Sequence, residues 1–180
     1  MLDFRRFMGL SPPFLSLFGS RRIPAERNVF LVPPVIPEYG DPVFRTVLTC
    51  TSSKEGDIID LTPRVEKAIA ESGIRTGLVQ LFVQHSTAAL TTIEFEPGVL
   101  SDLKRALSVL APDDADYAHN TRWGDGNGRS HVKAALVGPS LTVPVENGKL
   151  LCGTWQQIVL LELDVNAGRR RSVICTVDGA

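Results

Sequence analysis

Hydrophobic positions change their spacing repeatedly after Pro42, from every second residue to every third or fourth. Alternation is typical of a half-buried strand, and the longer spacing is typical of an amphipathic helix. The helical spacing predicts one helix from Thr62 to Gly73 and another from Pro97 to about Leu110. The alternating segments predict strands at 43–51, 57–60, 78–85, 88–95, 141–145, 150–152, 156–165 and 171–177.

The segment from Asp113 to Arg129 is polar and rich in glycine, which predicts a long loop without packed elements. Residues 131–137 are apolar again and fit either a short helix or a strand. Short connections between strands, including a hairpin turn at Asn147-Gly148, favour mostly antiparallel sheets. The order β-β-α-β-β-α followed by three or four strands predicts an α+β fold.

The first 41 residues differ from the remainder because they contain no regular hydrophobic period and end in the proline-dense run "VPPVIPEYGD". We expect an extended or poorly ordered N-terminal extension at 1–41 and a single domain at 42–180. A chain of 180 residues with 43% hydrophobic content is long enough to bury one substantial core.

The charge balance limits the kinds of partner that we expect, and the cysteines limit the cellular location. The 19 basic and 20 acidic residues nearly cancel, so we expect no nucleic-acid partner, and no apolar run is long enough to predict a membrane partner. The three cysteines are odd in number and far apart, which argues against a disulfide framework or a zinc knuckle. A reducing, cytoplasmic location fits this cysteine use best.

The three histidines all fall between residues 85 and 131. His85 ends an apolar strand, whereas His119 and His131 bracket a glycine-rich run that also contains Asp125 and Asn127. A metal ion would take histidines and one carboxylate as ligands, with an open position for water or substrate. Alternatively, the histidines and a glutamate are metal-free acid–base groups. The residues alone leave both chemistries open.

Other polar residues are candidates for the same site. Glu94 lies on the strand after His85, while Glu96 is better explained as the start of the helix at Pro97. Arg129 is a candidate to hold a phosphate, whereas the run 169–171 of three arginines is expected to be solvated. Glu162 shares a strand face with apolar residues, which calls for a buried partner or a subunit contact.

Three segments carry a resemblance to a known family: "QHSTAALTTIEFEPG", "YAHNTRWGDGNGRSHVKAALVGPSLTVPVENGKLLCGTWQQIVLLELD" and "RRRSVICTV". Together they resemble the YjbQ family, often labelled secondary thiamine-phosphate synthase, over roughly residues 43–178. The resemblance implies a two-sheet β-sandwich with two helices and a homotrimer. The family's polar positions fall here on His85, Glu94, His119, Asp125, Asn127, His131, Thr154, Trp155 and Gln156.

The resemblance also implies an activity, the joining of a pyrimidine pyrophosphate to a thiazole phosphate to give thiamine phosphate. Such a small phosphorylated substrate asks for neutralisation by a divalent ion, zinc or magnesium, and by basic side chains. The alternatives are an anion- or metal-binding homotrimer without turnover and a metal-dependent phosphoester hydrolase. The expected roles are metal ligation by His119, His131 and His85, catalysis by His85, Glu94 and Asp125, and substrate binding by Asn127, Arg129, Thr154 and Gln156.

Overall fold

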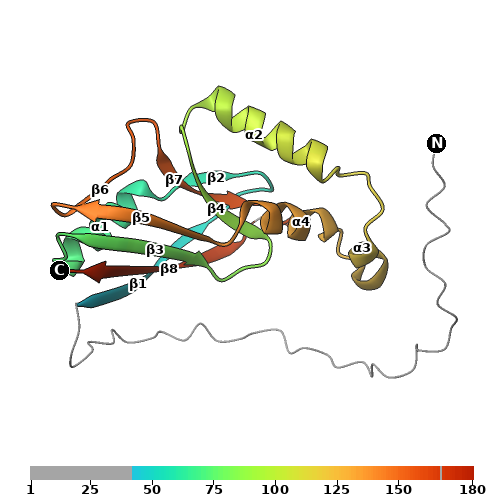
Figure 1. Ribbon diagram of the computed structural model, residues 1–180. Coiled ribbons are helices and arrows are strands. Elements are labelled where there is room, and N and C mark those ends of the chain that lie inside the picture. Colours follow the sequence, from blue (N-terminus) through green and yellow to red (C-terminus); the bar gives the residue numbers. More distant parts are fainter. Residues whose placement is uncertain (1–41, 167) are drawn as a thin grey trace, which may run out of the picture. The chain divides into compact units, whose positions relative to one another are not determined.

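The computed structural model describes residues 42–166 and 168–180, which form an α+β fold (Figure 1). The predicted N-terminal extension lies outside the described residues. Within the described part there are eight strands and four helices. In chain order they are β1 (Val43–Thr51), β2 (Ile58–Asp60), α1 (Thr62–Ser72), β3 (Gly77–Val83), β4 (Ala88–Ile93), α2 (Pro97–Leu110), α3 (Ala118–Trp123), α4 (Gly128–Val137), β5 (Ser140–Glu146), β6 (Lys149–Leu150), β7 (Gln157–Glu162) and β8 (Arg170–Gly179).

The strands form two antiparallel sheets, as the short connections predict. A large sheet has the order β1-β8-β3-β5-β6, and a small sheet has the order β2-β7-β4. Their facing sides enclose the main core together with α1, which contributes Val65 and Ile69. The predicted two-sheet, sandwich-like α+β class is therefore confirmed, although the described residues contain four helices and not two.

The central strand of the small sheet faces two cores at once. In β7, Ile158 and Leu160 join the main core, while Val159 and Leu161 point to the opposite side. There they pack with Leu107 of α2 and other residues of a second cluster, to which α4 also contributes. This continuous apolar run is what a strand covered on both faces requires. The small sheet is thus a middle layer between the large sheet and the α2–α4 side of the fold.

The predicted long loop at 113–129 is wrong, because α3 and the start of α4 lie within it. Helix α3 has no buried residue, so it shows no hydrophobic period. The buried residues of α4 include the small or polar Gly128, Ser130 and Lys133, which also hide the helical pattern. Residues 131–137, which fitted either element, belong to this helix.

Helices α1 and α2 both start at the residues that the sequence predicts. Glu96 begins α2 by accepting hydrogen bonds from the backbone N–H groups of Gly98 and Val99, which confirms its helix-start role. Leu61 is the N-cap of α1 and forms no side-chain cap, while the hydroxyl of Thr62 accepts a hydrogen bond from the N–H of Ile158 in the small sheet. That hydrogen bond ties α1 to β7.

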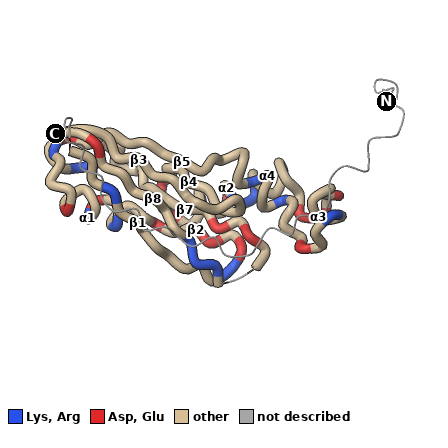
Figure 2. Tube along the Cα trace, turned by 90° about the horizontal axis from the view of Figure 1, so that it is seen from below, with Lys and Arg blue, Asp and Glu red and all other residues tan. Residues whose placement is uncertain are grey.

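Acidic and basic positions are interspersed along the described chain, as the balanced composition suggests (Figure 2). None of the helices in the described part of the chain has the length and apolar character needed to cross a membrane.

Candidate functional site

His119 on the short helix α3 contacts both an aspartate and a second histidine. The Nε2 atom of His119 lies 3.3 Å from the carboxylate of Asp125. The imidazole rings of His119 and His131 are in contact, with centroids 4.5 Å apart and planes tilted by 55°. The side chains of His119 and Asp125 are 31% and 42% exposed, so a substrate can reach them from solvent. These three predicted site residues are therefore brought together.

The backbone around Asp125 fixes where its carboxylate points. Gly124 and Gly126 on either side have φ values of 68° and 72°, in the left-handed region that favours glycine. The resulting turn lets the N–H of Asn127 donate to Asp125 Oδ1 over 3.1 Å. This backbone hydrogen bond is the main cause that lowers the pKa of the Asp125 carboxyl, and the hydrogen bond with His119 adds to it.

Asn127 connects this exposed pair to the interior. Its side chain is buried, its carbonyl oxygen accepts from the N–H of Val165 over 3.1 Å, and its amide group donates to Asp164 over 3.4 Å. Next to it, the N–H of Gly128 donates to Asn120 Oδ1 over 2.8 Å. Sequence reasoning placed Asn127 in contact with substrate, whereas in the structure its side chain anchors the loop that carries Asp125.

Behind Asn127 lies a buried ionic cluster of Glu162, Asp164 and Arg171 with Thr87. Glu162 is fully buried and receives two hydrogen bonds from the Arg171 guanidinium, one of them 2.7 Å long from Nε to Oε2. Arg171 also donates to the Thr87 hydroxyl over 3.1 Å, and that hydroxyl donates to Asp164 over 3.0 Å. Each charge therefore has a partner, as burial requires.

Two expectations bear on this cluster. The run of three arginines was expected to be solvated, which is wrong for Arg171, since only 3% of it is exposed. Glu162 was expected to need a buried partner or a subunit contact, and Arg171 is that buried partner. Burial acts to raise the pKa of Asp164, but hydrogen bonds from Asn166, Thr87 and Arg169 outweigh it and hold the pKa well below its usual range.

His85 lies beside the ionic cluster. Among the described residues it belongs to no group of side chains arranged to hold a metal ion. Its Nε2 atom accepts a 3.0 Å hydrogen bond from the backbone N–H of Ser172, the residue after Arg171. Burial lowers the pKa of His85, and the positive charge of Arg171 lowers it further. Because Nε2 accepts this hydrogen bond, the neutral ring of His85 supports the backbone at Ser172, next to Arg171. Its predicted role as ligand or catalyst stays a prediction.

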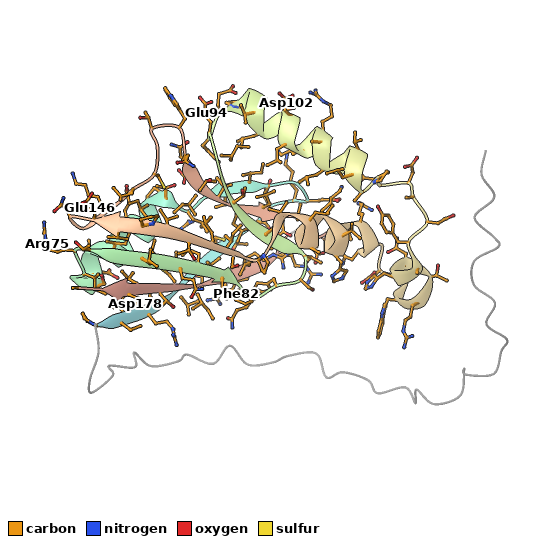
Figure 3. The ribbon with its side chains drawn as sticks, viewed as in Figure 1. Arg75, Phe82, Glu94, Asp102, Glu146 and Asp178 are labelled. Carbon is orange, nitrogen blue, oxygen red and sulfur yellow. The ribbon has the colours of Figure 1, made fainter. Side chains whose placement is uncertain are left out.

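Glu94, Thr154 and Gln156 lie at the opposite end of the small sheet. Glu94 follows the last residue of β4, whereas His85 precedes its first, and an extended strand of this length spans roughly 17 Å. Figure 3 shows Glu94 near the start of α2. Thr154 and Gln156 precede β7, whose first residue pairs with the last residue of β4. Within one chain, the length of β4 therefore separates these three residues from His85.

Arg129 is held by acidic side chains of the protein itself. It forms a two-pronged pair with Glu55, both distances being 3.0 Å, and its Nε atom lies 3.1 Å from Asp113. These contacts raise the pKa of Arg129, with the Glu55 hydrogen bond as the largest cause. A substrate would therefore compete with Glu55 and Asp113 for the guanidinium of Arg129.

The fit of a metal ion depends on how many donors converge. Two imidazoles and a carboxylate are donor types found at catalytic zinc sites. Within the residues that the structure describes, however, no group of three histidine, cysteine, aspartate or glutamate side chains is arranged to hold a metal ion. As placed, His119, Asp125 and His131 do not fit a metal ion.

The comparisons with known proteins agree on one family. A family model described as "UPF0047 protein YjbQ-like" matches residues 46–180. The chain belongs to this YjbQ-like family. A UPF0047 protein of Methanothermobacter thermautotrophicus is 41% identical over 128 residues, covering 71% of this chain and 88% of that protein. YjbQ of Escherichia coli O157:H7 is 37% identical, covering 59% and 76%.

Solved structures of the family match the fold. The crystal structure of a protein of unknown function from Sulfolobus solfataricus superimposes with a TM-score of 0.71 at 31% identity, covering 77% of this chain and 98% of that one. A hypothetical protein from Aeropyrum pernix gives a TM-score of 0.69 at 29% identity, with 76% and 99% covered.

These names correct the predicted reaction. The matching relatives carry the name of an uncharacterised family, and none of the names states an enzymatic activity. The family assignment is therefore right, and the thiamine-phosphate synthase activity attached to it, together with the alternatives named beside it, is not supported.

Proposed function

We propose that this protein is an enzyme in which the His119–Asp125 pair transfers a proton to or from a small anionic substrate. The observation that carries the proposal is the 3.3 Å contact between His119 Nε2 and the Asp125 carboxylate in an exposed, glycine-flanked turn. A carboxylate that accepts from one ring nitrogen sets the tautomer of the imidazole and leaves the other nitrogen as a proton acceptor.

The pair has the parts that general acid–base catalysis needs. Asp125 stays ionised over a wide pH range because the Asn127 N–H lowers its pKa, so it can stabilise the charged imidazolium that forms when His119 takes a proton. Asn127 in turn holds the turn in place through Val165 and Asp164. The base is thus oriented by a carboxylate that is itself oriented by a buried side chain.

The position of Arg122 is the reason to expect an anionic substrate, such as a phosphorylated one. It lies three residues after His119 on α3, a spacing that makes the two side chains neighbours on the helix surface. Its guanidinium lies 5.7 Å from the centroid of the Trp123 ring. Among the described residues it forms no ion pair. We therefore expect a phosphate or carboxylate of the substrate to pair with Arg122 while His119 moves the proton.

The proposal is tested by incubating the purified protein with a metabolite extract and following the consumption of small anions by mass spectrometry. We expect Asp125→Asn to slow consumption by about 10²–10⁴-fold, the range attributed to a positioned acid–base group. Asp102→Asn is the matched control, since Asp102 is an exposed aspartate on α2 paired with Arg105. Equal rates in wild type and Asp125→Asn would refute the proposal.

We also propose a divalent ion, zinc or magnesium, as a cofactor of these residues in a rearranged site, since they do not fit one as placed. The observation behind this proposal is that the His119 ring contacts both the His131 ring and the Asp125 carboxylate. Such an ion would need a change in the positions of these side chains or a further donor. Elemental analysis would decide: a stoichiometric metal in wild type that disappears in a folded His119→Ala, His131→Ala variant supports it, and equal content in both contradicts it.

We also propose that the protein assembles as a homotrimer. Phe82 and Leu78 of β3 are 45% and 49% exposed on the outer face of the large sheet, and Figure 3 places Phe82 on the side away from α2. The register aligns Phe82 with Ile174 and, one strand further, with Val47, which extends the apolar row. Light scattering after size-exclusion chromatography should give three times the chain mass in wild type and a smaller mass in Phe82→Glu. A monomeric wild type would contradict the proposal.

A further inference from the structure

A cavity outside the histidine site lies between α2, α4 and the turn before β2. Its volume is about 240 Å³, and it is open to solvent on one side. By comparison with the roughly 30 Å³ that one water occupies in the liquid, this is room for a ligand of about eight non-hydrogen atoms. Its lining includes Glu55, Lys104, Leu107, Ser108, Asp113, Lys133 and Leu163.

The side chains around the cavity include one more basic group than acidic groups. Glu55 is paired with Arg129, and Asp113 is paired with Arg129 and with Lys133, so two acids balance two basic groups. Lys104 forms no ion pair with any of the described residues. A surplus of one positive charge matches a ligand with one negative charge better than a dianion or a cation.

Two lysines supply hydrogen-bond donors to this space. The side chain of Lys133 is only 8% exposed, and Asp113 Oδ1, 2.9 Å from Nζ, is its one acceptor among the described side chains and backbone groups. An ammonium group carries three donors, so Lys133 has capacity for a further acceptor. Lys104 crosses from α2 towards Gly56, where a side chain in place of the glycine hydrogen would lie 3.9 Å from Lys104 Cδ.

The other side chains that line the cavity indicate which part of the ligand lies next to its negative charge. Leu107 and Leu163 are buried apolar residues that reach the cavity, and Ser108 adds a hydroxyl. An apolar wall with a few convergent polar groups is the usual composition of a small-molecule site. We propose that this cavity binds a small monocarboxylate, with its carboxylate between Lys104 and Lys133 and its short apolar body against the two leucines. The proposal is independent of acid–base chemistry at His119.

The test uses hexanoate, which has one charge and eight non-hydrogen atoms, as the probe in a titration followed by amide NMR of the full chain. We expect saturable shifts centred on Gly56 and Ser108. Lys104→Met should weaken binding by about tenfold, since it removes a charge-assisted hydrogen bond while keeping an unbranched, helix-compatible side chain. Lys149→Met, a change at the exposed end of the β5–β6 hairpin, is the matched control and should bind like wild type.

Hexylammonium and inorganic phosphate are the competing probes. The proposal predicts saturable binding of hexanoate alone. Shifts that do not saturate, stronger binding of phosphate or hexylammonium, or equal hexanoate affinity in wild type and Lys104→Met would each overturn it. Because none of these variants alters His119 or Asp125, failure of this proposal leaves the rate loss expected for Asp125→Asn to be judged separately.

Discussion

Asn127 connects two polar clusters, and these differ in how far their charged side chains are buried and paired. The Glu162–Arg171–Asp164 cluster is buried, and every charge in it has a fixed partner. The His119–Asp125 pair is exposed, with ring nitrogen and carboxylate open to solvent. Buried ion pairs hold a fold because removing one partner strands the other, whereas an exposed pair contributes little to stability and remains available for proton transfer. We therefore assign structure to the first cluster and chemistry to the second.

The largest effect should come from breaking the buried cluster. Arg171→Met leaves Glu162 as an uncompensated buried charge, so we expect the free energy of unfolding to fall by about 3–5 kcal/mol in urea denaturation. The neighbouring Arg170 is exposed, and Arg170→Met should change the same quantity by less than about 0.5 kcal/mol. Equal losses in the two variants would contradict the structural role of Arg171.

Asn127→Ala tests the link between the two clusters. It removes the acceptor of the Val165 N–H and a donor to Asp164, and we expect a loss of about 1–3 kcal/mol because buried groups lose their partners. The backbone amide and ring signals of Asp125 and His119 should shift in NMR spectra of the folded variant. Unchanged spectra would show that Asn127 does not position the exposed pair.

His85 should make stability depend on pH in a defined direction. Its pKa is lowered in the folded protein from the ordinary value of 6.5, so the unfolded chain binds more protons just below that pH. Stability from this group is therefore complete above about pH 6.5 and is lost as the pH falls towards the folded pKa. Urea midpoints at a series of pH values between 7.5 and 5 should fall in wild type.

The matched variant is His85→Gln, which keeps an acceptor for the Ser172 N–H and removes the titrating ring. Its urea midpoint should fall less over the same pH range. An identical pH dependence in both proteins would assign the effect to other groups. Asp164 is not one of them, because its lowered pKa affects stability only below about pH 4.

The smallest effect on stability is expected at the exposed pair. Asp125→Asn should change the free energy of unfolding by less than about 0.5 kcal/mol, since the pair is exposed and asparagine keeps an acceptor for the Asn127 N–H. Thermal or urea denaturation at pH 7 measures this. A loss comparable to that of Arg171→Met would mean that the two clusters do not differ as we propose.

The fold could be predicted from the sequence wherever apolar residues keep a clear period. The strands β3 and β5 are the clearest examples, because buried and more exposed residues alternate along each of them. Helix α3 could not be found in this way, since it has no buried residue and contacts α4 through the polar side chains of His119 and Asn120. Local patterns record burial, so an element without a buried face leaves no period.

The candidate site could be predicted only in part for a similar reason. His119, Asp125 and His131 stand out as rare residue types around glycines, and the structure brings them together. Glu94 was grouped with His85 because both are polar and close in sequence, although an extended strand between them places them at opposite ends of β4. Arg171 was missed because a run of three arginines looks solvated, although the acidic Glu162 on a buried strand face signalled that some cation must pair with it.

The central claim is that the exposed His119–Asp125 pair carries the chemistry while the buried cluster carries the fold. Its most direct test is the rate at which wild type and Asp125→Asn consume the same small anion from a metabolite extract, measured where both have the same circular dichroism spectrum. We predict a loss of about 10²–10⁴-fold in Asp125→Asn. Equal consumption by the two proteins, or no anion consumed by wild type, would contradict the claim.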